Sequence, residues 1–335
     1  MWVLRLEPEG IMAHEIDTTT GRAAVIVAGM PAWHRLGTNV AEVQTSADAI
    51  RLAALDWQVE QWPLVARRDG IEHEVPGRVA NVRSDDGGVL GTVGRDYRVF
   101  QNADAFGFMD DLVGEKLAMY ETAGAIRGGR VVWMMARLPR TVWATDDDPI
   151  RPYLLLCNTH DGSRALRLIP TSVRTVCSNT LHLALRQASS TEGLTIGHKQ
   201  SLAGRVKEAR DKLGLVSQRV DEFETQVRAM ARRSMTGAKL GAYFAVLVAE
   251  RAEAVQKKLL DRFAENFDDD TNTPPGMKGS LWAALNAATE WADHQSVVRG
   301  KTEVERADHR LNSVWFGSAA EFKQRAFDAA LALAV

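Results

Sequence analysis

The segment from Cys157 to Arg186 concentrates residue types that could do chemistry. It holds both cysteines of the 335-residue chain, two of its eight histidines and four arginines, and Asp161 is its one acid. Such a set could form a zinc site, activate a cysteine nucleophile, or bind phosphate. The elements that position these side chains decide between the three.

The apolar pattern after Pro170 changes to a helical period, so we predict a helix that Thr171 or Ser172 caps. On this helix Cys177 and His182 would lie about 140° apart around the axis, which is poor zinc geometry. The full zinc pattern would use Cys157, His160, Cys177 and His182. We expect two buried structural thiols instead, because free cysteine packs as a small apolar side chain. No base stands beside either thiol in sequence, which disfavours a nucleophile.

The same predicted helix supports phosphate binding. Arg174, Ser178, His182 and Arg186 are four residues apart in series and would form one polar stripe. The helix N-terminus offers free N–H groups, and two arginines of the preceding strand adjoin it. We therefore predict a nucleic-acid interface built from Arg127, Arg130, Arg164, Arg167, Arg174, Arg186, Lys199, Arg205 and Lys207. An ordinary solvated helix face is the alternative.

The charge distribution agrees with this interface. Residues 1–126 carry 11 Lys+Arg and 19 Asp+Glu, residues 127–240 carry 19 and 10, and residues 241–335 carry 11 and 14. The net charges are therefore −8, +9 and −3, which sum to the −2 of the whole chain. A basic middle suits a polyanion, although these arginines could also pair with the acidic flanks.

A second polar stripe lies on a helix predicted over residues 280–294. It consists of Asn286, Glu290, Asp293 and His294, of which Glu290 and His294 are four residues apart. Glu290, Asp293 and His294 are candidate ligands of a divalent metal. A hydrogen-bond network inside the protein is the more economical interpretation of polar residues between apolar helix faces. No catalytic residue, cofactor or bound metal is predicted.

The predicted fold class is α+β: an N-terminal β-hairpin-rich sheet with packed helices, followed by a long-helix C-terminal half. Hairpin turns are predicted at 85–88, 127–129 and 160–163, and short helices start at Thr45 and Asn102. We predict an N-terminal arm over 1–40, a core over 41–200, long helices over 201–267, a linker over 268–278 and a final helical segment over 279–335. A heptad seam from Leu202 to Met230 indicates packing against a helix of this chain or of a second copy.

Composition bounds the class of protein. The chain is 45% hydrophobic and 25% charged, with no apolar run near the roughly 20 residues that span a bilayer. The N-terminus lacks the pattern of a secretory signal, and two cysteines fit a reducing compartment, so we expect a cytoplasmic protein. Neither a phosphate-binding glycine loop nor a zincin motif occurs.

Four segments together resemble a known family. They are WHRLGT from Trp33, GRDYRVFQN from Gly94, HDGSRALRLIPTSVRTVCSNTL from His160 and LWAALNAATEWADH from Leu281. In this order they resemble the phage/plasmid-like family built on the domain of unknown function nine-three-two. The resemblance implies a gene of a phage, prophage or plasmid, and it supplies no catalytic residues.

A weaker, fold-level resemblance connects the chain to single-strand annealing recombinases of the Redβ, Erf and Rad fifty-two kind. These combine β-hairpins, helices, a basic groove and oligomers, without ATP. The resemblance implies ATP-independent binding or annealing of single-stranded DNA in recombination, by a homo-oligomer that needs no membrane. The alternatives are an interaction protein without nucleic acid, such as an inhibitor of host defence, and a metal-dependent nuclease.

Overall fold

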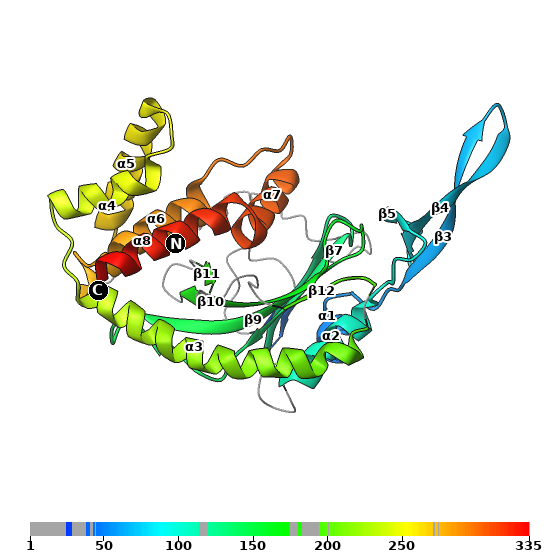
Figure 1. Ribbon diagram of the computed structural model, residues 1–335, viewed down its shortest axis with the longest axis horizontal. Helices are drawn as coiled ribbons and strands as arrows, with labels where there is room; N and C mark the ends of the chain where they lie inside the picture. The colour runs from blue at the N-terminus through cyan, green and yellow to red at the C-terminus, as the bar shows by residue number, and fades with distance from the viewer. Residues whose placement is uncertain are drawn as a thin grey trace, which may run out of the picture.

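The computed structural model describes residues 25–28, 38–40, 43, 45–113, 119–174, 180–182, 194–199, 201–270, 272–273 and 275–334. Within them two β-sheets and two layers of helices make up an α+β protein (Figure 1).

The larger sheet runs through the centre of the molecule in the order β11-β10-β9-β7-β6-β1-β2, with β8 paired to β9 and β12 to β10. All its described pairings are antiparallel except that of β1 with β2. Its strands are β1 (Val25–Ala28), β2 (Thr38–Val40), β6 (Met119–Ile126), β7 (Val131–Arg137), β8 (Val142–Trp143), β9 (Pro149–Thr159), β10 (Leu166–Arg174), β11 (Thr180–His182) and β12 (Leu194–Ile196).

The central strands are apolar on both faces. On β7, Trp133 packs into one core and its neighbour Met134 packs into another on the opposite face. The same alternation separates Leu155 from Leu156 on β9, because successive side chains of a strand point to opposite faces. A sheet with two apolar faces needs a helical layer on each side.

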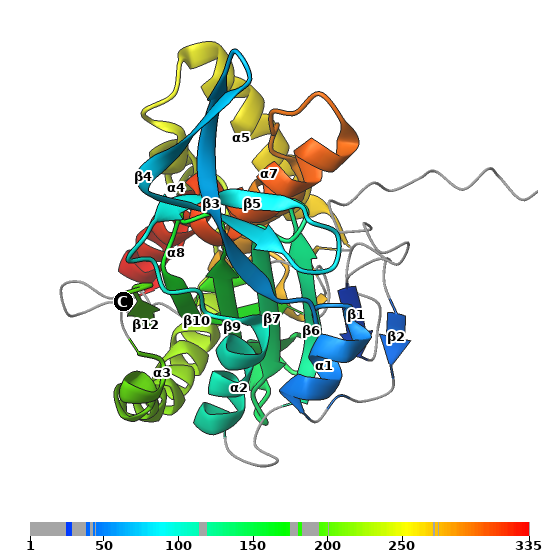
Figure 2. The same cartoon turned by 90° about the vertical axis from the view of Figure 1, so that its right-hand side faces the viewer.

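Short helices cover one face and the C-terminal helices cover the other (Figure 2). The first layer consists of α1 (Ser46–Leu52) and α2 (Asn102–Val113). The second contains α4 (Ala238–Val248), α5 (Glu253–Asp268), α6 (Leu281–Glu290), α7 (Glu303–Phe316) and α8 (Ser318–Ala334). Helix α3 (Val206–Arg232) contacts α2 as well as α6 and α8, so it links the two layers. Short 3-10 helices lie at Ala203–Arg205 and Pro275–Met277, and a π-helical turn at Trp291–Gln295 continues α6.

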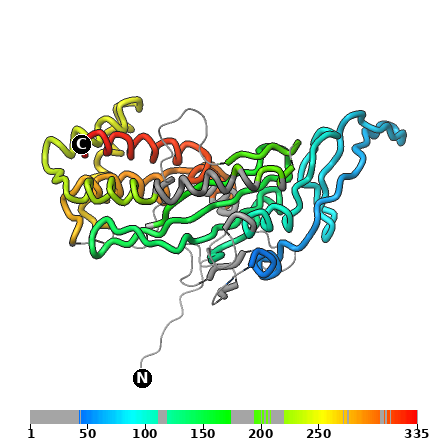
Figure 3. The backbone as a smooth tube through the Cα atoms, turned by 60° about the horizontal axis from the view of Figure 1, so that its bottom comes forward, coloured from blue at the N-terminus to red at the C-terminus, as the bar shows by residue number. Residues whose placement is uncertain are grey.

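The smaller sheet has the order β3-β4-β5, formed by β3 (Val59–Arg68), β4 (Ile71–Arg83) and β5 (Val89–Gly94). Its base is attached to the central sheet through Arg83, which is 1% exposed, bonds Asp85 of its own turn and donates a hydrogen bond of 3.3 Å to the Gly128 carbonyl in the turn between β6 and β7. The far ends of β3 and β4 extend away from the rest of the chain, at the end of the molecule opposite to α4 and α5 (Figure 3).

Several local predictions are confirmed. Helix α1 begins after Thr45, whose side chain accepts a hydrogen bond from the Asp48 N–H, and α2 begins at Asn102. The three predicted turns each connect two antiparallel strands, namely β4 to β5, β6 to β7 and β9 to β10.

The predicted fold class is wrong in its second part. Only α3, with 27 residues, is a long helix, while α4 to α8 have 10 to 17 residues each. The helical pattern is interrupted near Gly237, which has a positive φ of 54°, and by the non-helical residues around Arg251. The first part also changes, because the hairpins form two sheets instead of one.

The helix predicted after Pro170 is also wrong in its described part. Strand β10 continues through Thr171 and Ser172 to Arg174, and His182 lies on β11. Pro170 pairs with Leu154 of β9, at a point between the segments of β10 that pair with β12 and with β11. Among the described strands, neither β12 nor β11 pairs with Pro170 on that outer side, where a proline is tolerated.

The heptad seam is closed within the chain over its second half. Val220, Phe223, Val227 and Met230 are all buried in the core that α6 and α8 share. These positions are therefore not available to a second copy of the chain. The predicted domain boundaries stay predictions, although α5 and α6, which flank the predicted linker 268–278, pack in one core.

Among the helices that the structure describes, none combines the length and apolar character required to cross a membrane.

Candidate nucleic-acid interface

Strand β10 and the hairpin before it hold two of the predicted arginines against α7. Arg164 Nη1 donates a hydrogen bond of 2.7 Å to Asn312 Oδ1. The guanidinium carbon atoms of Arg164 and Arg167 lie 5.1 and 5.8 Å from the centroid of the Phe316 ring. Both cations therefore meet at one aromatic side chain, which attracts them through its π electrons.

The turn between β6 and β7 supplies Arg127 and Arg130 beside this hairpin. The Arg130 carbonyl accepts a hydrogen bond of 2.8 Å from the His160 N–H. At Gly129, with a φ of 89°, an added Cβ would come within 2.9 Å of the Trp57 ring, so glycine is required. The turn can approach the smaller sheet closely, and the Arg130 side chain stays exposed.

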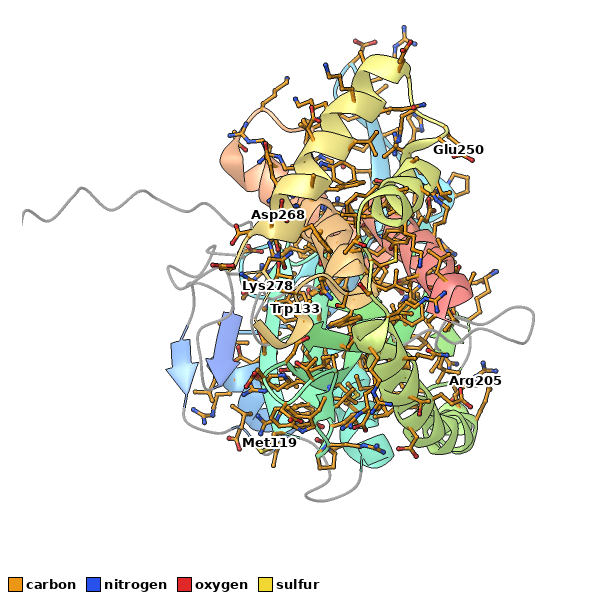
Figure 4. The ribbon with its side chains drawn as sticks, turned by 90° about the vertical axis from the view of Figure 1, so that its left-hand side faces the viewer. Met119, Trp133, Arg205, Glu250, Asp268 and Lys278 are labelled. Atoms are coloured by element: carbon orange, nitrogen blue, oxygen red, sulfur yellow. The ribbon has the colours of Figure 1, made fainter. Side chains whose placement is uncertain are left out.

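Lys199 and Arg205 follow β12, on the other side of β10. Lys199 is exposed, whereas Arg205 forms an ion pair of 3.0 Å with Glu208. Figure 4 shows Arg205 at the margin of the molecule and Trp133 inside it, between sheet and helices. Arg205 is thus partly neutralised within the chain.

The remaining predicted residues are less well placed. Arg174 ends β10 and Lys207 lies in the first turn of α3, but their side chains are outside the described residues, and Arg186 lies wholly outside them. The predicted helical stripe does not exist in the described part, because Arg174 and His182 belong to strands. The structure thus groups Arg127, Arg130, Arg164, Arg167, Lys199 and Arg205 around the ends of β10 and β7.

Four of these residues lack an acidic partner in the part of the chain that the structure describes. Arg130, Arg164, Arg167 and Lys199 have no carboxylate within ion-pair distance there. The alternative that the acidic flanks neutralise the arginines therefore does not hold for these four among the described residues, and Arg205 is neutralised by Glu208 of the basic segment itself.

A buried polar network lies under this basic surface, and sequence reasoning missed it. His160 Nε2 lies 2.9 Å from Asn102 Oδ1, and Asn81 Nδ2 donates 2.7 Å to the His160 carbonyl. Asn158 Nδ2 donates a hydrogen bond to the Phe100 carbonyl, and Tyr97 Oη donates one to the Thr159 carbonyl. Polar residues in otherwise apolar segments were the available signal.

The network locks two sequence segments together. His198 stacks on Tyr97 and Phe100, with ring centroids 4.3 and 4.6 Å apart. The segment from Gly94 to Asn102 thereby fixes the hairpin that begins at His160, and this hairpin carries Arg164. Two of the segments that carry the family resemblance thus position the basic residues.

Both buried histidines are neutral at neutral pH. Burial and, to a smaller extent, the nearby His198 together lower the pKa of His160 to about 3. Burial also lowers the pKa of His198. The cationic character of the surface therefore comes from arginine and lysine alone.

We predict an acid-dependent loss of stability from His160. In the unfolded chain His160 has a pKa near 6.5 and becomes protonated below that pH, whereas in the folded chain it stays neutral down to about pH 3. The free energy of unfolding therefore falls as the pH is lowered from about 6.5 toward about 3. In the variant His160→Gln the free energy of unfolding should depend less on pH, by up to about 1.4 kcal/mol per pH unit. Urea unfolding at pH 7, 6 and 5 measures this dependence in both proteins. Equal slopes in both proteins would contradict the assignment.

Cys157 is poorly suited to act as a nucleophile. This thiol is buried, and desolvation raises its pKa to about 12 although Arg164 and Arg167 oppose the shift. A protonated thiol without contact to solvent reacts slowly at neutral pH. The prediction of a buried structural thiol is confirmed for Cys157, and Cys177 lies outside the described residues.

Asp293 and His294, two of the candidate metal ligands that follow α6, contact other side chains of the protein. Asp293 Oδ1 accepts a 2.6 Å bond from Lys323 Nζ, and both side chains are buried. His294 Nε2 lies 4.0 Å from Glu290 Oε2. No group of three or more potential metal ligands occurs within the described ranges. The network interpretation thus describes Asp293, whose partner is a lysine of α8.

We predict a strong and non-additive effect at this buried pair. Lys323→Met leaves the Asp293 charge without its ammonium partner and should lower the free energy of unfolding by about 3–5 kcal/mol. The double variant Asp293→Asn/Lys323→Met removes both charges and should recover at least about 1 kcal/mol of this loss. Urea unfolding measures both, and equal stability of the two variants would refute the pairing.

The comparisons with known proteins agree with the resemblance seen in the sequence. The family described as Domain of unknown function (DUF932) matches residues 89–315, which is about two thirds of the chain and runs from β5 to α7. No curated protein and no solved structure matches the chain.

Proposed function

We propose that this chain, which belongs to the family described as Domain of unknown function (DUF932), binds single-stranded DNA through the surface around Arg130, Arg164, Arg167 and Lys199. In this proposal it acts in the cytoplasm without ATP, as a homo-oligomer, in recombination or annealing of phage or plasmid DNA.

One observation carries the proposal. Two guanidinium groups, those of Arg164 and Arg167, converge on Phe316, and no carboxylate of the described residues lies within ion-pair distance of them. Like charges held close together are unfavourable unless an anion joins them. A phosphate group matches the planar donor fork of arginine, and successive phosphates of a strand could reach Arg130 and Lys199.

The surroundings favour the backbone over the bases as the part that is bound. Trp315 is 8% exposed and Phe316 is already covered by the two arginines, so neither offers a free face for base stacking. Contacts to phosphates release counterions, and the affinity should therefore fall steeply with salt and depend little on sequence.

The test is a salt series of fluorescence anisotropy with a labelled oligothymidylate and unlabelled duplex as competitor. Arg164→Ala/Arg167→Ala should weaken binding by roughly tenfold or more, and should reduce the slope of log K against log salt by about 1.4, which is 0.7 for each lost contact.

The matched control is Arg228→Ala/Arg262→Ala, which removes two arginines that are ion-paired on α3 and α5. It changes the net charge by the same amount and should leave affinity and slope almost unchanged. If both double variants bind the oligothymidylate with the same affinity, or if the wild type shows no salt-sensitive binding, the proposal is contradicted and a protein partner is favoured.

A further inference from the structure

The far part of the smaller sheet is an exposed two-stranded arm, defined here as residues 60–78 of β3, β4 and their turn. All its residues are exposed or half-buried, including apolar ones: Trp62 is 49%, Val65 50% and Ile71 60% exposed. Figures 1 and 3 show the arm extending away from the other elements. Apolar side chains on an isolated hairpin indicate a surface that a partner covers, because two strands alone are marginally stable.

The arm is poorly suited to DNA. Residues 60–78 contain three arginines and four acids, so their formal charge is −1. Several of these charges already neutralise each other, as in the pairs Arg67–Glu72 and Arg95–Glu74. A nearly neutral, partly apolar surface fits a protein partner.

The free edge of β3 can be identified from its hydrogen bonds. At the base, the N–H and C=O of Val59 both bond the side chain of Gln101, while its cross-strand partner Arg83 bonds Gly87 and Gly88 instead. The backbone groups of Val59 therefore point away from β4. The irregular pairing between Pro63 and Val65 places its extra residues on β4, so alternation along β3 directs the backbone groups of Gln61, Pro63, Val65 and Arg67 to the edge that has no partner strand among the described residues.

The sequence of β3 complements itself in one antiparallel register. If two copies pair with Leu64 opposite Leu64, Glu60 lies opposite Arg68 and Trp62 lies opposite Ala66. In the same register the residues whose backbone groups point to the edge lie opposite one another, so they can form the hydrogen bonds between the two strands. A shift by two residues places Glu60 opposite Ala66 or Gly70, and the charge pairing is lost. Pro63 lacks an N–H and removes one hydrogen bond in each copy, which leaves the other edge bonds intact.

We propose that two copies of the chain associate through their β3 edges, antiparallel and centred on Leu64, to form a continuous six-stranded sheet. The interface is isologous, so each favourable pair occurs twice. This proposal gives the homo-oligomer of the proposed function its contact surface, but it rests on no property of DNA binding, and its test contains no nucleic acid.

Sedimentation velocity of the full chain over a concentration series provides the test. The wild type should sediment as a dimer of twice 36.9 kDa. Glu60→Arg and Arg68→Glu each place like charges opposite one another twice, and each should weaken the dimer roughly tenfold. The exchange Glu60→Arg/Arg68→Glu restores opposite charges and should restore the dimer. Asp104→Arg, an exposed change on α2, is the matched control and should have no effect.

A second variant tests the register independently of the affinity. Leu64→Cys places two thiols across the two-fold axis, and mild oxidation should yield a covalent dimer on a non-reducing gel. Val65→Pro removes an N–H donor of the edge and should give a monomer with unchanged circular dichroism. A wild type that is monomeric at all concentrations overturns the proposal. The proposal is also overturned if the dimer persists in Val65→Pro, if the exchange Glu60→Arg/Arg68→Glu does not restore the dimer, or if oxidised Leu64→Cys forms no covalent dimer.

Discussion

The structure depends on one constraint, which is that the central sheet is apolar on both faces. Trp133 and Met134 on β7, like Leu155 and Leu156 on β9, enter opposite cores. Burying both faces removes far more apolar surface from water than a one-sided sheet could. The helices after β12 are therefore required to cover one face, and they form one body with the strands. The same requirement explains why the second half of the α3 seam closes within the chain.

Covering both faces also leaves the ends of the strands as the place where polar groups gather. The turns at 127–130 and 160–165 lie at one end of the sheet, where the buried His160 bonds Asn102 and the buried Asn158 donates to the Phe100 carbonyl. This network fixes the hairpin that carries Arg164 and Arg167, two half-buried arginines that both approach the Phe316 ring.

Local features of the fold could be predicted from the sequence because local physics decides them. Glycines that adopt positive φ mark the turns, and Thr45 caps α1. The part of β10 after Pro170 could not be recognised as a strand, because it is buried on both faces and lacks alternation, and because Pro170 suggested a helix start. The site was partly predictable: the sequence points to Arg164 and Arg167. Their contacts Asn312 and Phe316 lie about 150 residues further along the chain, and only the tertiary fold brings them there.

The central claim is that DNA meets the chain at this end of the sheet. Hydrogen–deuterium exchange with and without a saturating oligothymidylate locates the contact directly. The account predicts added protection in the segments 127–130, 159–167 and 194–205, with residues 60–78 unchanged by the DNA. Protection confined to residues 60–78 or to α4 and α5, or no change anywhere, would contradict it.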